Sequence, residues 1–169
     1  MAKTAKDYED QAKKEEANGN YDAAAKNFYE AAALYKKDGD SNKADEMRNK
    51  EQAALGKMDY GDLQDAAAKL DGHARNLEDK AEDASDSGAY EGTGGSTEMF
   101  AAAAAAWEQA AERYVALVAD AIKRKDHKMA AALHRKAARD YERAALDLEK
   151  AAEDEPDTPK QQVEAKAIL

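Results

Sequence analysis

Hydrophobic and small residues recur along the chain at three- and four-residue intervals, the period of an α-helix rather than of a strand. The pattern predicts an all-α fold of about six helices. We expect these helices at residues 4–17, 21–37, 41–58, 63–84, 97–123 and 127–153. Short connections favour antiparallel hairpins, arranged either as a repeat array or as a helical bundle.

Turn signals separate the first four predicted helices. Asn18-Gly19-Asn20 and Asp38-Gly39-Asp40 each place a glycine beside residues that favour turns and left-handed backbone. Ser41 is the predicted N-cap of the third helix, because a serine side chain can accept a hydrogen bond from the first turn. The sequence Asp59-Tyr60-Gly61-Asp62 predicts a break or kink before the fourth helix.

The two long C-terminal helices carry rows of alternating large and small residues, which we expect to be their buried faces. The first row is Phe100, Ala103, Trp107, Ala110, Tyr114, Val118 and Ile122. The second row is Ala130, His134, Ala137, Tyr141, Ala144 and Leu148. Small residues let two helices approach closely while large ones fill the gaps, so the rows predict a tight antiparallel hairpin.

The composition of two segments predicts the domain organisation. Residues 85–96 are rich in Gly and Ser and predict a flexible linker. This linker would divide a helical region at residues 1–84 from a long hairpin at residues 97–153, followed by a disordered tail at residues 154–169. The Gly-rich run lacks the lysine and the preceding strand of a phosphate-binding loop.

Charge and composition exclude several classes of function. Charged residues make up 37% of the chain and alanine is abundant, so we expect a thin core with little apolar area. The net charge of -10 argues against nucleic-acid binding. Without a long apolar run or a signal-like segment, we expect no membrane insertion and a cytoplasmic location. The absence of cysteine excludes disulfides and thiolate chemistry.

The segment from Tyr8 to Tyr35 carries the most specific pattern. It reads Gly19-Asn20-Tyr21-x-x-Ala24-x-x-x-Phe28-x-x-Ala31-x-x-Leu34, preceded by Tyr8 and Ala12. Over one repeat it resembles the tetratricopeptide-repeat signature, with Glu15 at a position that is usually aromatic. Later hairpins match loosely. The chain also looks like soluble NSF attachment proteins, and residues 1–58 resemble microtubule-interacting-and-trafficking domains in layout.

These resemblances imply a class of function. All three families are adaptors without catalytic residues, so the chain is expected to be a non-enzymatic protein–protein interaction adaptor without a cofactor. Its partner would contribute a peptide or a helical segment. Tetratricopeptide grooves often hold the carboxylate end of a peptide, and Lys13 and Asn27 would serve that purpose here. Tyr29 follows the core residue Phe28 directly, which predicts an exposed contact residue.

A basic cluster on the last hairpin is the strongest candidate for partner binding. It includes Lys128, Arg135, Arg139 and Arg143, and the three arginines are spaced four residues apart on one helical face. Such a row can hold an acidic peptide or helix through charge-assisted hydrogen bonds. The alternative is a solvated face whose charges pair locally. The local acidic residues are Asp120, Asp126, Asp140 and Glu142.

Other functions have weaker support. His127 and His134 are seven residues apart, without the spacing of a helical metal site, so no metal is expected. No carboxylate is expected in an apolar setting that would shift its pKa. The main alternative is a structural, self-assembling bundle in which the Trp107 and Tyr141 rows join two copies. An engineered scaffold without a ligand is a further alternative, against which the irregular turns argue.

Overall fold

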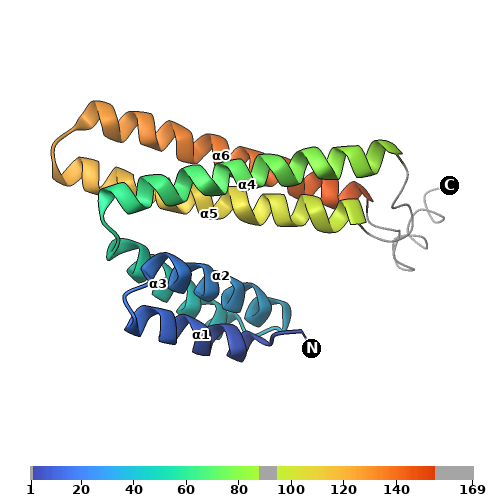
Figure 1. Cartoon of the computed structure of the whole chain (residues 1–169), viewed down its shortest axis with the longest axis horizontal. Helices are drawn as coiled ribbons and strands as arrows, with labels where there is room; N and C mark the ends of the chain where they lie inside the picture. The colour runs from blue at the N-terminus through green and yellow to red at the C-terminus, as the bar shows by residue number, and fades with distance from the viewer. Residues whose placement is uncertain (1, 88–94, 155–169) are drawn as a thin grey trace. The chain divides into compact units, whose positions relative to one another are not determined.

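The computed structural model describes residues 2–87 and 95–154, which form six α-helices (Figure 1). They are α1 (Ala5–Ala17), α2 (Tyr21–Lys37), α3 (Ser41–Gly56), α4 (Tyr60–Ser87), α5 (Gly95–Lys123) and α6 (His127–Asp154). The described residues contain no strand, which confirms the all-α prediction. Along the N-terminal part, α1 packs against α2 and α2 packs against α3.

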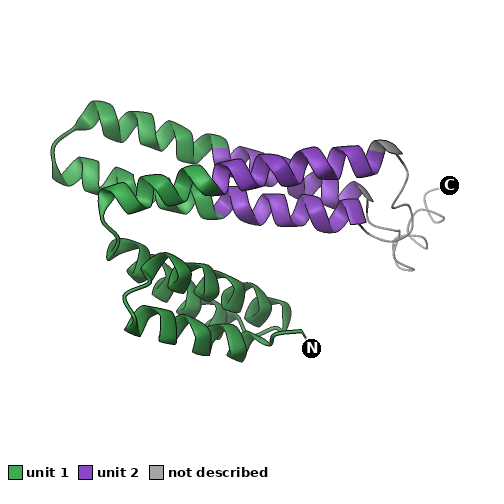
Figure 2. Ribbon diagram, viewed as in Figure 1, with its two compact units in different colours: residues 1–69, 109–139 green, residues 70–108, 140–169 purple. Residues whose placement is uncertain are grey.

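The three long helices each contribute to two compact units (Figure 2). Unit 1 contains the chain up to Lys69 together with Gln109–Arg139. Unit 2 contains Leu70–Glu108 and the chain from Asp140 onward. Consequently α1, α2 and α3 belong to unit 1, whereas α4, α5 and α6 each run from one unit into the other.

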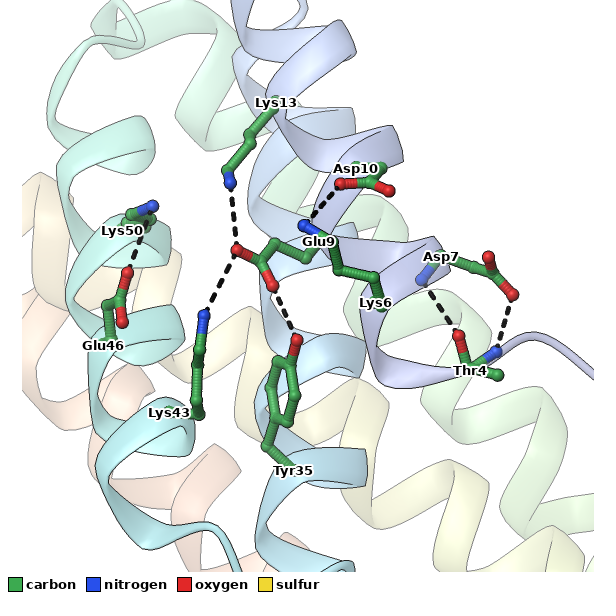
Figure 3. Close-up of polar contacts among 10 residues, drawn as sticks. All are labelled: Thr4, Lys6, Asp7, Glu9, Asp10, Lys13, Tyr35, Lys43, Glu46 and Lys50. Carbon is green, nitrogen blue, oxygen red and sulfur yellow. Dashed lines mark hydrogen bonds and ion pairs between the residues drawn. The ribbon is translucent and has the colours of Figure 1, made fainter.

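Local hydrogen bonds explain where the first helices begin and end. Thr4 Oγ1 accepts a hydrogen bond from the Asp7 backbone N–H at 3.1 Å, and the Asp7 carboxylate accepts one from the Thr4 N–H at 2.9 Å (Figure 3). This reciprocal capping box fixes the start of α1. Gly19 and Gly39 have φ values of 78° and 85°, the left-handed conformation that glycine adopts without strain. The two predicted turns are therefore confirmed.

Aspartate side chains cap both α3 and α4, and one predicted N-cap is wrong. The N-cap of α3 is Asp40 rather than Ser41, because the Asp40 carboxylate accepts a hydrogen bond from the Lys43 N–H at 3.0 Å. The predicted break before the fourth helix is present but lies at residues 57–59, so that α4 already begins at Tyr60. There Asp59 Oδ1 accepts a hydrogen bond from the Asp62 N–H at 2.8 Å. A carboxylate is favoured at both places since it also interacts with the helix dipole.

The predicted linker is shorter than residues 85–96. α4 continues to Ser87 and α5 begins at Gly95, so both ends of the predicted linker are helical. Residues 88–94 lie outside the described residues, as do residues 155–169 of the predicted tail. The division into domains at this linker stays a prediction.

The buried row of α5 follows the prediction as far as Tyr114 and then shifts. Leu117 and Ala121 are buried toward the C-terminal end of the helix, whereas Ile122 is 55% exposed. A straight helix has 3.6 residues per turn, so a row that always advances by four residues drifts around the helix. Leu117, three residues after Tyr114, brings the row back to the core.

The predicted buried row of α6 is wrong at each of its large residues. His134, Tyr141 and Leu148 are exposed. The buried residues are Ala130, Leu133, Ala137, Asp140, Ala144, Asp147 and Ala151. The three predicted alanines are buried as expected. At each predicted large residue, however, the preceding residue is buried instead, namely Leu133, Asp140 and Asp147. One residue corresponds to a rotation of about 100° around a helix. The polar partners of the buried α6 side chains explain this rotation, as described below.

Candidate functional site

The predicted basic row lies on α6, and three of its four members are exposed. Lys128, Arg135 and Arg139 all have exposed side chains. Arg135 and Arg139 are one helical turn apart, so the helix presents their guanidinium groups along one side. The structure therefore brings these two predicted residues together on an accessible surface of a regular helix.

Arg143 differs from the rest of the row because it is part of the packing of unit 2. Its Nη1 lies 3.2 Å from Oε2 of Glu78 on α4. Its guanidinium also lies over the ring of Trp107, 5.1 Å from the centroid. The Trp107 indole N–H in turn donates a hydrogen bond to Oε1 of Glu78. Arg143 thus has a structural role that joins the three helices of unit 2.

The predicted residues near the first hairpin are engaged within unit 1. Lys13 Nζ lies 3.0 Å from Glu9 Oε1, and Asn27 Nδ2 donates a hydrogen bond to the Ala23 carbonyl at 3.0 Å. Tyr29 is half-buried rather than exposed, and the guanidinium of Arg48 lies 5.0 Å from its ring centroid. These contacts make the first hairpin a weaker candidate surface than α6.

Glu9 ties the first three helices together from a buried position (Figure 3). Its carboxylate accepts a hydrogen bond from the Tyr35 hydroxyl at 2.6 Å and contacts the ammonium groups of Lys13 and Lys43. Burial alone would raise the pKa of Glu9, but the hydrogen bonds from Tyr35 and Lys13 and the lysine charges lower it to about 2. Glu9 therefore stays ionised in the folded chain near neutral pH.

A second buried carboxyl group in unit 1 has the opposite behaviour. Glu51 on α3 and Glu112 on α5 are fully buried, and Arg48 contacts both carboxyl groups. Burial, and next the hydrogen bond and charge of Glu112, raise the pKa of Glu51 to about 10. Glu51 is therefore protonated at neutral pH. The expectation that no carboxylate would lie in a pKa-shifting environment is wrong.

Unit 1 also contains a buried arginine. Arg113 of α5 is fully buried, and its Nε lies 2.8 Å from Oδ1 of Asp22 on α2. Its Nη1 donates a hydrogen bond to the Gln109 carbonyl at 2.9 Å. Burial would raise the pKa of Asp22, but the Arg113 charge and hydrogen bond outweigh this and lower the pKa. This pair holds α5 against α2.

Asp147 is the corresponding buried carboxyl group of unit 2. Burial, followed by the hydrogen bond and charge of Glu78, raises the pKa of Asp147 to about 7. The fully buried ring of Trp107 packs in the same unit against Ala74, Ala104, Ala106 and Ala144. The polar partners on α4 and α5 thus explain why α6 turns Asp147, rather than Leu148, toward them.

These buried carboxyl groups are better explained by a role in helix packing than by a role in catalysis or metal binding. Glu51 and Glu112 are 0% and 2% exposed, so a substrate has no access to them in this conformation. Among the residues that the structure describes, no group of three or more His, Asp or Glu side chains could hold a metal ion. The pairs resemble ion-pair networks that fix which helices pack together.

An open cleft of about 710 Å³ lies within unit 1, between the start of α2 and the start of α4. Its lining includes four aspartates and three lysines, namely Asp22, Asp59, Asp62, Asp65, Lys26, Lys57 and Lys69. The negative charge of Asp59 is the main cause that raises the pKa of Asp62. This cleft could not be predicted from the sequence, because two segments that are distant in the chain, residues 19–26 and 57–69, form it together. Its mixed charges select neither an acidic nor a basic ligand.

Comparison with models of known protein families, with curated proteins and with solved structures gives no match. The resemblance to tetratricopeptide repeats and related adaptors therefore remains a prediction. Within residues 2–87 and 95–154, no helix is long and apolar enough to cross a membrane.

Proposed function

We propose that the protein is a non-enzymatic protein–protein interaction adaptor that uses α6 to bind an acidic peptide or helix of a partner. The observation that carries the proposal is the exposure of Lys128, Arg135 and Arg139 along one regular helix. The chain as a whole has a net charge of -10, so this local concentration of positive charge contrasts with its surroundings. As part of the proposal, we place this role in the cytoplasm.

The chemistry of arginine supports recognition of carboxylates. A guanidinium group offers several N–H donors in a planar fork, and it forms stronger hydrogen bonds with a carboxylate than with a neutral acceptor. Because the side chains are exposed, salt would screen the interaction, and affinity in the micromolar range is expected. The predicted resemblance to tetratricopeptide adaptors supports the same class of function.

Capture from a lysate of the source cells tests the proposal. Three baits are compared: the unchanged protein, Arg135→Glu/Arg139→Glu, and the control Lys14→Glu/Lys80→Glu. Lys14 and Lys80 are exposed on α1 and α4, so the control has the same net charge as the test variant. We expect mass spectrometry to identify a partner that the first and third baits retain and the second loses. Equal recovery by all three baits would contradict a role for the basic row.

A further inference from the structure

A second row of residues with helical spacing runs along an exposed side of α6, rotated by about 100° from the buried row. We call this row the outer face; its members alternate between spacings of four and three residues. They are His127, Ala131, His134, Ala138, Tyr141, Ala145, Leu148 and Ala152, and all are exposed. Tyr141 and Leu148 are 43% and 54% exposed. All eight lie on one continuous helix, so their alignment follows from α6 alone.

Large and small residues alternate strictly along the outer face. Alternate four- and three-residue spacing is the heptad pattern by which two helices pack side by side. If two copies of α6 pack antiparallel about the midpoint of this row, each alanine faces a large residue of the other copy. Ala138 then faces Tyr141 of the second copy, and Ala131 faces its Leu148. A parallel pair would instead place alanine against alanine and leave gaps between the large residues.

The charges beside the outer face favour the same orientation. One flank carries an exposed residue every seven positions: Lys128, Arg135, Glu142 and Glu149. The first two are basic and the last two are acidic. An antiparallel pair places Arg135 opposite Glu142 of the second copy and Lys128 opposite its Glu149. A parallel pair lacks these contacts, because it would place this charged row beside the opposite flank, which consists of the alanines at positions 130, 137, 144 and 151.

We propose that α6 pairs antiparallel with α6 of a second copy of this chain. The acidic segment held by the basic row is then the C-terminal half of α6 itself. This inference rests on the proposed function, since Lys128 and Arg135 belong to the row that is proposed to bind a partner. It adds the identity, the orientation and the register of that partner.

Sedimentation equilibrium of the full chain over a range of concentrations provides the test. We expect the unchanged protein to approach twice the mass of one chain as its concentration rises. Arg135→Glu places like charges opposite each other twice in the symmetric pair. We therefore expect the dissociation constant of the dimer to rise at least about tenfold. Arg135→Glu/Glu142→Arg exchanges the two charges, so we expect this variant to dimerise again.

A matched variant controls for net charge. Arg135→Glu/Glu149→Arg has the same composition as the exchanged variant. In the antiparallel pair, however, its introduced glutamate lies opposite Glu142 and its introduced arginine lies opposite Lys128. We expect it to remain monomeric at concentrations where the exchanged variant dimerises. Circular dichroism checks that every variant retains its helices, as these exposed positions should allow. Equal dimerisation of the two double variants would overturn the proposed pairing.

The outcome separates this inference from the proposed function. A chain that stays monomeric at every concentration, yet captures a foreign partner through Arg135 and Arg139, refutes self-pairing and leaves the adaptor role intact. Loss of both self-association and charge-dependent capture refutes both. Recovery of dimerisation in the exchanged variant supports self-pairing, because a foreign acidic partner would not regain binding from that exchange.

Discussion

The two faces of α6 differ in a way that its amphipathic pattern alone does not predict. The buried face contains two carboxyl groups, Asp140 and Asp147, whereas the outer face carries Tyr141 and Leu148 one position later. Burial of a carboxyl group costs free energy that burial of leucine would not. The helix is nevertheless turned so that the aspartates face inward. Polar partners and close packing of alanines therefore decide the orientation of α6.

The same comparison explains why the outer face is proposed to bind. A helix whose large apolar residues all lay inward would leave a polar surface with little reason to associate. Here Tyr141 and Leu148 remain exposed beside alternating alanines and complementary charges. Exposed apolar residues in an ordered row are typical of protein–protein contacts. The buried face thus serves the fold, and the outer face is available for assembly.

The two faces of α6 should differ most in how much a substitution on each side changes the free energy of unfolding. Trp107 is fully buried against the inward side of α6, where it packs with Ala144. Its replacement by alanine leaves a cavity and should lower the free energy of unfolding by about 3–5 kcal/mol. Leu148→Ala on the outer face should change the free energy of unfolding by less than about 0.5 kcal/mol. Urea denaturation at low protein concentration measures both; comparable losses would contradict the assignment of faces.

A smaller effect is expected from the buried carboxyl group of α6. Because its pKa in the folded chain is raised to about 7, Asp147 binds a proton that the unfolded chain has released. Its contribution to stability is therefore fully present below about pH 4 and is lost as the pH rises through about 7. Asp147→Asn keeps a neutral side chain and should be more stable than the unchanged protein at pH 8 by about 1–3 kcal/mol.

Chemical denaturation at pH 5 and pH 8 tests this difference. The gap between Asp147→Asn and the unchanged protein should widen at the higher pH. The matched control is Glu149→Gln, which removes an acidic group from an exposed position on the same helix. If the control shows the same pH-dependent gap, the effect belongs to the net charge of the helix and not to burial of Asp147.

Local signals in the sequence predicted the ends of the helices better than their packing. Gly19 and Gly39 mark turns by a property of their own backbone, and both turns were predicted correctly. The orientation of α6 could not be predicted in this way, because its buried and outer rows have the same spacing. The choice between them depends on Glu78 and Trp107, which are distant in sequence from Asp147.

Part of the buried polar network was nevertheless visible in the sequence. Glu51 lies four residues after Met47 and four residues before Leu55, both of which are buried, so its position on the core face followed from spacing. The size of its pKa shift did not follow, because burial is reinforced by the hydrogen bond and charge of Glu112, which is distant in sequence. Likewise, the basic row was visible as a pattern, but the engagement of Arg143 with Glu78 was not.

The measurement that tests the proposed assembly most directly is the distance between equivalent positions in two copies of α6. The chain contains no cysteine, so a single nitroxide label can be attached at Leu146→Cys or at Glu153→Cys, both at exposed positions. For antiparallel helices with a rise of 1.5 Å per residue, pulsed electron paramagnetic resonance should give about 20 Å for the first label and about 40 Å for the second. Equal distances for the two labels, or no distance between copies, would contradict the account.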